Sequence, residues 1–166
     1  MINMLKLKCS IFKQVSEMTD QEFSIEQFDE AGDAAFRVTA ENLEALFAAC
    51  GHALSKLIFP FERTGGPLKE QVLALHSADL ESLLVDFLSE LIFLFDSQAF
   101  ISREFQFQVH VREEQVQLVG QVHGFSLPPV GPGEQLLGFV PKGVSYHLLE
   151  VGETEKGWSA QFVLDG

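Results

Sequence analysis

Residues 77–112 read SADLESLLVDFLSELIFLFDSQAFISREFQFQVHVR, and they contain two hydrophobic patterns in succession. Over residues 80–95 the apolar side chains recur every three or four positions, which is the spacing of one face of an α-helix, and Ser77 stands where an N-cap is expected. From Phe105 onward every second residue is apolar, the period of a strand with one buried face. A helix followed by a half-buried strand favours helices packed on an antiparallel sheet.

The same two patterns occur elsewhere in the chain. A further helix is predicted over residues 40–59, where the apolar residues again share one face and Thr39 is the expected N-cap. The fold class is therefore α+β, with two helices packed on one face of a mostly antiparallel β-sheet in two layers. The other patterned segments are short and are predicted to be strands: residues 22–29, 35–38, 68–75, 116–122, 144–148 and 158–164.

The composition narrows the classes of partner. The chain has 166 residues, which fits one domain, and 11 Lys and Arg against 24 Asp and Glu give a net charge of −13. That charge repels phosphate backbones and anionic lipid, so no direct nucleic-acid partner and no membrane partner is expected. The two cysteines, Cys9 and Cys50, form no CxxC pair, and no apolar run reaches the length of a membrane span. We therefore expect a cytoplasmic protein.

Residues 1–17 differ from the rest of the chain because they carry three lysines and a single acidic residue. Met18 follows directly, which leaves two interpretations open. The segment is an N-terminal extension, disordered or preceding the native start, or it is an edge strand that packs on the body. We take residues 18–166 as the single domain.

Most sequence motifs of enzymes are absent. The chain has no GxxxxGK[ST], GxGxxG or GxSxG sequence, and its five histidines lack the spacing of metal ligands and are interpreted as polar-face residues. Two acidic residues stand out by context: Asp33 lies among small residues in AGDAA, and Asp165 ends the apolar segment WSAQFVLDG. They are either solvated carboxylates near strand ends or a pair of oxygen ligands for Ca²⁺ or Mg²⁺.

Five stretches carry motifs in the order and at spacings compatible with one known family. FDEAGD with the following Arg37-Val38 resembles an F-x-H-T-A-D box, DLESLLVDFLSEL resembles a D-L-E-x-L-L-V-x-W-L-N-E-L helix, and KGVSYH resembles a K-A-x-T-Y-H box. The family that they resemble is archease, and the resemblance covers residues 22–166. The stretches are residues 28–38, 43–47, 79–91, 142–147 and 157–166.

The resemblance implies a function. Archease is a small cytosolic protein that assists the RtcB-type RNA ligase of tRNA splicing and RNA repair, promoting formation of the ligase–guanylate intermediate and turnover without itself being a ligase. It binds a divalent metal, so we expect calcium here, with magnesium or manganese as alternatives. The matched positions assign Asp33, Asp165 and Gly166 to the metal and Lys142 to a nucleotide or partner site, and we expect Glu30 to belong to that nucleotide or partner site as well. No catalytic residue is expected.

One departure from the family concerns Glu30, which stands where archeases have histidine, while Ala31 stands in place of their threonine. Glu30 adds a negative charge beside Asp33, so either the cation is bound differently or the protein has left the ligase pathway. The second outcome would make it a non-enzymatic interaction module or chaperone-like module. An independent metal-dependent hydrolase has the least support, because no general base with an orienting partner is recognisable.

Overall fold

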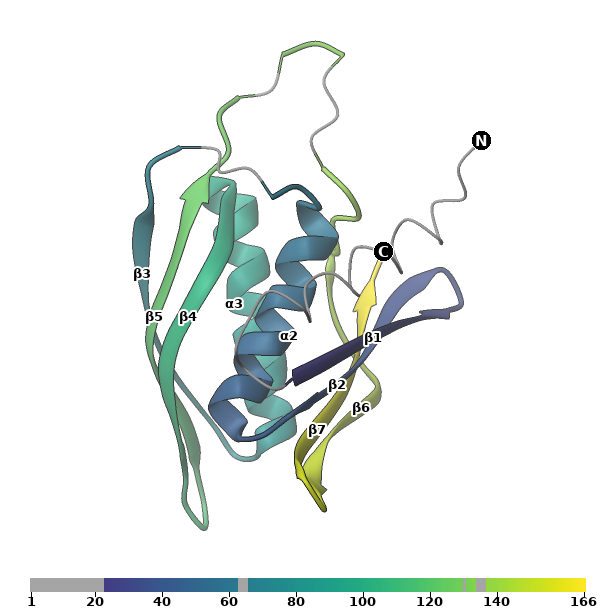
Figure 1. The fold of residues 1–166 in the computed structure, drawn as a ribbon, viewed down its shortest axis with the longest axis vertical. Helices are drawn as coiled ribbons and strands as arrows, with labels where there is room; N and C mark the ends of the chain where they lie inside the picture. The colour runs from purple at the N-terminus through teal and green to yellow at the C-terminus, as the bar shows by residue number, and fades with distance from the viewer. Residues whose placement is uncertain (1–22, 63–65, 130, 134–136) are drawn as a thin grey trace.

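The computed structural model describes residues 23–62, 66–129, 131–133 and 137–166. The extension expected over residues 1–17 lies outside these residues, so the division at Met18 stays a prediction. The elements of the described chain are β1 (Phe23–Glu30), β2 (Asp33–Ala40), α2 (Leu43–Ile58), β3 (Lys69–Ser77), α3 (Leu80–Gln98), β4 (Phe100–Val111), β5 (Val116–Ser126), β6 (Gly143–Thr154) and β7 (Gly157–Asp165) (Figure 1).

The predicted α+β class is confirmed: two helices pack against antiparallel sheets. The structure adds that the strands divide between two sheets, one in the order β1-β2-β7-β6 and the other in the order β3-β5-β4. Both helices contact both sheets and lie between them (Figure 1). The prediction placed all strands in one sheet with both helices on one of its faces, whereas the structure has a sheet on either side of the helices. The difference arises because sequence alternation identifies a strand but not its partner.

The helix α2 is buried almost all round because it has a sheet on either side. Its sequence allows this through small residues, several alanines and Gly51, that let other elements approach closely. A Cβ at Gly51 would lie 2.5 Å from a ring carbon of Phe105, so this position has no room for a side chain. Cys50 is fully buried on the same helix, and burial raises the pKa of its thiol well above the ordinary value.

Both predicted helix caps were wrong by two or three residues. The N-cap of α2 is Asn42, whose Oδ1 accepts the Ala45 N–H at 2.8 Å, whereas Thr39 belongs to β2 and its hydroxyl bonds to that of Ser24. The N-cap of α3 is Asp79, whose Oδ1 accepts the Ser82 N–H at 2.7 Å. Ser77 instead ends β3 and donates its hydroxyl to Asp86 at 2.6 Å. In both cases the strand before the helix is longer than its alternating pattern indicated. The helix therefore begins later in the chain, and so does its N-cap.

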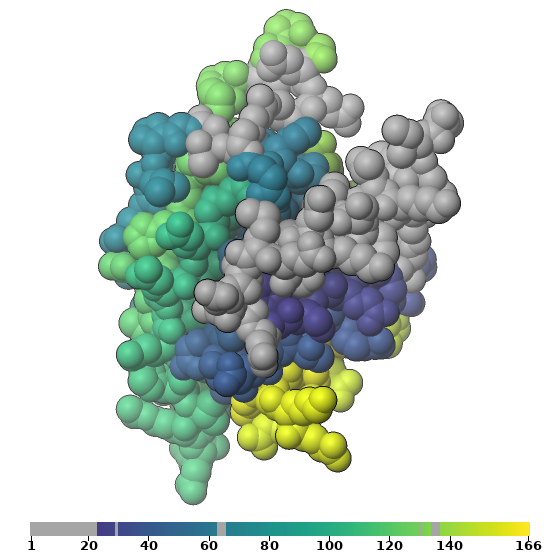
Figure 2. Space-filling view, viewed as in Figure 1, coloured from purple at the N-terminus to yellow at the C-terminus, as the bar shows by residue number. Residues whose placement is uncertain are grey.

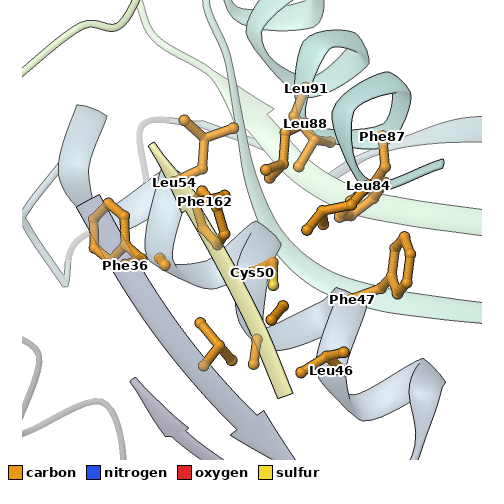
Figure 3. Close-up of a cluster of buried hydrophobic side chains, with 14 of the residues drawn as sticks. Phe36, Leu46, Phe47, Cys50, Leu54, Leu84, Phe87, Leu88, Leu91 and Phe162 are labelled. Carbon is orange, nitrogen blue, oxygen red and sulfur yellow. The ribbon is translucent and has the colours of Figure 1, made fainter. Parts of the chain in front are cut away.

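The core lies between the helices and the two sheets and is rich in phenylalanine (Figure 3). Phe36 of β2 stacks on Phe162 of β7 with ring centroids 5.3 Å apart, and Phe47 of α2 lies 5.7 Å from Phe87 of α3. The β4–β5 hairpin extends past the helices at one end of the molecule (Figure 2), where Val111 is 57% exposed. Neither helix of the described chain has the length and apolar character needed to cross a membrane.

A glutamate in the first turn of each helix also accepts a hydrogen bond from an edge strand. Glu44 Oε1 of α2 accepts the Val109 N–H of β4 at 3.0 Å, and Glu81 Oε1 of α3 accepts the Val151 N–H of β6 at 3.3 Å. Each glutamate satisfies a backbone donor on an edge strand, a group that would otherwise be available to another chain. Each also places a negative charge near the positive end of its helix.

Candidate functional site

Three carboxylates form a row across one end of the four-stranded sheet. Glu30 of β1 pairs with Asp33 of β2, and the β2–β7 ladder ends one residue before Asp33 and Asp165 would face each other. Residues directly opposite on neighbouring strands point to the same face of a sheet. We call Glu30, Asp33 and Asp165 the acid row. It lies on the face opposite to Phe36 and the helices, where the end of β7 is beside the β1–β2 hairpin (Figure 1).

Main-chain hydrogen bonds fix the acid row to its surroundings. The Gly166 N–H donates to Asp33 Oδ1 at 2.9 Å, and the Lys142 N–H donates to the Asp165 carbonyl oxygen at 2.8 Å. Asp33 and Asp165 are both half-buried, whereas the Lys142 side chain is exposed. The predicted residues Asp33, Asp165 and Gly166 therefore come together from distant parts of the chain, with the backbone of Lys142 beside them.

A bulge in β6 adds a residue that the sequence interpretation missed. The pairing of β6 with β7 is interrupted between Ser145 and Glu150, and Leu148 within the gap has a left-handed φ of 59°. The bulge brings His147 Nε2 to 3.4 Å from Glu30 Oε1, although β6 and β1 are opposite edges of the sheet. His147 had been grouped with the polar-face histidines, and its only distinguishing signal was its place in the KGVSYH stretch.

Two side-chain bonds hold this bulge. The Ser145 hydroxyl accepts the His147 N–H at 3.0 Å, and the Gln161 side-chain amide donates to the Leu148 carbonyl oxygen at 3.1 Å. Gln161 lies on β7 and also accepts a hydrogen bond from Arg37 of β2 at 3.0 Å. Because Gln161 and Arg37 face each other on the outer side of the sheet, the bulge lies over that side.

The donor set of the acid row is chemically suited to a hard divalent cation. Carboxylate and main-chain oxygens are the ligands that Ca²⁺ and Mg²⁺ prefer. Within the part of the chain that the structure describes, no group of three or more His, Cys, Asp or Glu side chains is arranged to hold a metal ion. Asp33 and Asp165 would therefore need further oxygens, from the Gly166 backbone, from water or from a partner, to complete a coordination shell.

Two hollows of the described surface lie away from the acid row. One of about 380 Å³ is lined by Phe23, Thr39 and Trp158 at the other end of the four-stranded sheet, and one of about 590 Å³ lies over Val72 and Val119 on the three-stranded sheet. The acid row lies at the end of a sheet, on the side that the β6 bulge crosses. This geometry suits contact with another macromolecule better than enclosure of a small substrate.

Fold and site together define a class of protein: a small α+β protein of two antiparallel sheets around two helices, with carboxylates gathered at one sheet end. The model of the archease protein family matches residues 25–165. This chain belongs to the archease family.

Individual relatives agree with this assignment over nearly their whole length. The chain is 32% identical over 157 residues to protein archease of Methanosarcina mazei, covering 89% of this chain and 99% of the relative. It is 28% identical over 143 residues to protein archease of Pyrococcus abyssi, covering 84% of this chain and 96% of that one.

Two solved structures share the fold. The solution structure of protein 1598 of Methanobacterium thermoautotrophicum superposes with a TM-score of 0.66 at 22% identity, over 86% of this chain and 98% of the other. The crystal structure of an archease, possible chaperone, from Thermotoga maritima superposes with a TM-score of 0.56 at 15% identity, over 85% and 96%.

Proposed function

We propose that this protein is a metal-binding accessory protein that promotes guanylylation and turnover of an RtcB-type RNA ligase in tRNA splicing and RNA repair. The observation that carries the proposal is the convergence of Asp33 with Asp165 and Gly166, joined by the hydrogen bond from Gly166 to Asp33. These are the positions that the archease resemblance assigns to the metal. Membership of the archease family supports the same assignment.

The metal in this proposal is calcium, with magnesium or manganese as alternatives. Asp33 and Asp165 would supply carboxylate oxygens, and Gly166, whose N–H donates to Asp33, would supply a main-chain oxygen. A divalent cation at this point would offset the repulsion between neighbouring carboxylates, which gives the acid row a reason to bind one. When bound, the ion supplies a positive centre for an anionic group such as a phosphate. Lys142, exposed beside the row, provides a second positive charge to the same group.

The partner in this proposal is the ligase protein and not its RNA. A net charge of −13 opposes direct contact with RNA, while it suits a basic protein surface. The protein in this proposal acts on the ligase without being a catalyst, because no general base with an orienting partner is recognisable in its sequence. The ligase would therefore carry out the chemical steps itself, and this chain would supply oxygens, a cation and a lysine to the complex.

A second candidate function rests on the relative from Thermotoga maritima that is described as a possible chaperone. In that case this chain is an interaction or chaperone-like module that keeps the archease fold without the ligase role. Glu30 favours this alternative, because it places a further negative charge beside Asp33 in the acid row. The ligase role requires the acid row, whereas the chaperone-like role does not.

The test is guanylylation of the RtcB-type ligase from the same source, followed with labelled GTP in the presence of calcium or manganese. Wild-type protein should accelerate formation of the ligase–guanylate, and Asp33→Asn and Asp165→Asn should lose the effect while remaining folded. Glu155→Gln, an exposed carboxylate in the β6–β7 turn, is the matched control and should behave as wild type. No acceleration by the wild-type protein would reject the ligase role. Protection of a client protein that survives both Asp variants would favour the chaperone-like module.

A further inference from the structure

The side of the three-stranded sheet that points away from the helices carries valine, alanine and glutamine over its middle. We call this side the outer face; it consists of the alternate, outward-pointing residues of 70–76 in β3, 117–123 in β5 and 104–110 in β4. Its central positions are Val72, Ala74, Val119, Gln106, Gln108 and Gln121. All residues of the outer face are described, and among them there is no lysine or arginine, while the acids are confined to one end of the strands.

Apolar side chains of the outer face are exposed to solvent. Val72 is 70% exposed and Val119 is 47% exposed, and both line the hollow of about 590 Å³ on this sheet. The outer side of the four-stranded sheet differs, because it carries the ion pair of Glu26 with Arg37 and the acid row. On a chain of net charge −13, an uncharged and partly apolar face is a surface on which another acidic protein can pack without charge repulsion.

The two ends of the outer face carry opposite kinds of polar group. At one end Glu70 of β3 and Glu104 of β4 both lie in register with His123 of β5, and at the other end His76 and His110 occupy the same two edge strands. His123 Nε2 lies 3.2 Å from Glu70 Oε2, so an imidazole already contacts a carboxylate at the acidic end. Glu104 and His110 are roughly 20 Å apart along β4, so they do not touch within one copy of the chain.

This arrangement is complementary to itself. Two outer faces can pack on each other about a two-fold axis that lies between them and runs perpendicular to the strands. That axis reverses the strands, so Glu70 of one copy lies over His76 of the second copy, and Glu104 lies over His110, each contact occurring twice. A two-fold axis along the strands would instead place the acidic end over the acidic end. Charge therefore selects the first arrangement.

We propose that the outer face is the interface of a symmetric homodimer, in which a second copy of this chain packs with its strands reversed. At the centre, Val72 of each copy lies over Ala74 of the other, so a larger side chain meets a smaller one. The four registers of three strands cover roughly 400 Å² on each copy, which is small for a specific interface. The dimer is therefore weak and forms in the micromolar range or above.

The dimer leaves the acid row uncovered. The outer face belongs to one sheet and the acid row to the other, and the two helices lie between these sheets (Figure 1). The two acid rows of a dimer would therefore lie on its opposite outer sides, where each can meet a partner of its own. The inference goes beyond the proposed function and does not depend on it.

The experiment is sedimentation equilibrium of the full chain, without any ligase, from low micromolar to low millimolar concentration. The wild type should pass from the 18.5 kDa of one chain toward twice that mass as the concentration rises. Val72→Glu and Val119→Glu should each raise the dissociation constant of the dimer by at least about tenfold, because they place carboxylates inside an uncharged interface. Phe93→Glu is the matched control, since Phe93 is a 58% exposed apolar residue on α3, and it should dimerise as the wild type does.

A charge reversal tests the direction of packing. Glu104→Lys should raise the dissociation constant by at least about tenfold, because the new lysine lies over His110 of the second copy. Adding His110→Glu to the same chain should return the constant to within about threefold of the wild type, since lysine then lies over glutamate. The two positions are too far apart to interact within one copy, so this rescue reports a contact between copies.

Three results would overturn the inference. A wild type that stays monomeric over the whole concentration range has no such dimer. A dimer that Val72→Glu and Val119→Glu leave unchanged uses another surface. A double variant that is no tighter than Glu104→Lys alone contradicts the reversed packing. Circular dichroism of each variant checks that the fold is retained, and the guanylylation assay judges the proposed function separately.

Discussion

Gly166 and Asp33 are joined by a hydrogen bond of 2.9 Å from the glycine amide to Asp33 Oδ1, across 133 positions of sequence. The bond links the residue that follows the last strand to the first residue of β2. It holds the Asp33 carboxylate beside the end of β7, where Asp165 is the next position across the ladder.

Asp33→Asn should separate the charge of Asp33 from its structural role. The amide oxygen of asparagine still accepts the Gly166 N–H, so we expect the fold and melting temperature to be retained. The loss of one negative charge should lower calcium affinity by at least tenfold, because the carboxylate is a proposed ligand. Calorimetry and circular dichroism check the two parts, with Glu155→Gln as the control. Calcium affinity equal to that of the wild type would remove Asp33 from the proposed ligand set.

Lys142→Met should affect the partner reaction and not the fold. The bond from Lys142 to Asp165 uses the main-chain N–H, which methionine keeps, while the exposed ammonium group is lost. We expect the rate of ligase guanylylation to fall by about tenfold, with calcium affinity within about threefold of the wild type. Lys156→Met, an exposed lysine in the β6–β7 turn, serves as the control. Equal guanylylation rates for both variants would make Lys142 an ordinary surface lysine.

Much of the fold was predictable because periodicity reports local structure directly. Each helix and strand of the described chain lies near the residues where the sequence pattern predicted it, including the strand predicted from the strict alternation after Phe105. The caps were misplaced because Thr39 and Ser77 are used by strands whose ends depend on cross-strand pairing. The division into two sheets depends on the same long-range pairing, which a local pattern does not contain.

The candidate site was predictable in part. Asp33 and Asp165 attracted attention because small and apolar neighbours made each acid unusual, and the family resemblance joined them to Gly166 and Lys142. His147 was missed because its position depends on a register shift in β6, and a bulge of this kind leaves no periodic signal. The register also explains why Glu30 belongs to the acid row, since it pairs with Asp33 across the β1–β2 turn.

Glu44→Ala should destabilise the edge of the three-stranded sheet. Glu44 Oε1 accepts the Val109 N–H, and removal of this acceptor leaves a part-buried backbone donor without that bond. We expect a loss of about 1 kcal/mol in the free energy of unfolding, measured by urea denaturation at pH 7. Glu44→Gln keeps an acceptor oxygen and should lose less than half as much. Equal losses for alanine and glutamine would indicate that the charge near the helix N-terminus, and not the hydrogen bond, stabilises the fold.

His52 should make stability depend on pH in a defined window. Its ring stacks on Phe23 with centroids 6.2 Å apart and meets the edge of Phe105 at 4.9 Å. Burial foremost, and then the positive charges of Arg103 and Lys56, lower its pKa from 6.5 to about 4. The folded protein therefore keeps His52 neutral at pH values where the unfolded chain protonates it.

The sign of the effect follows from proton linkage. Between pH 6.5 and about 4 the unfolded state binds a proton that the folded state does not, so the stability contributed by neutral His52 is complete above pH 6.5 and is lost as the pH falls toward 4. The loss is on the order of 3 kcal/mol for a shift of this size. Other groups titrate in the same range, so the measurement is a difference: urea denaturation of wild type and His52→Leu at pH 7.5 and at pH 5. We expect the gap between them to shift in favour of the leucine variant at pH 5, and parallel pH profiles would show that His52 is protonated in the folded protein as readily as in the unfolded chain.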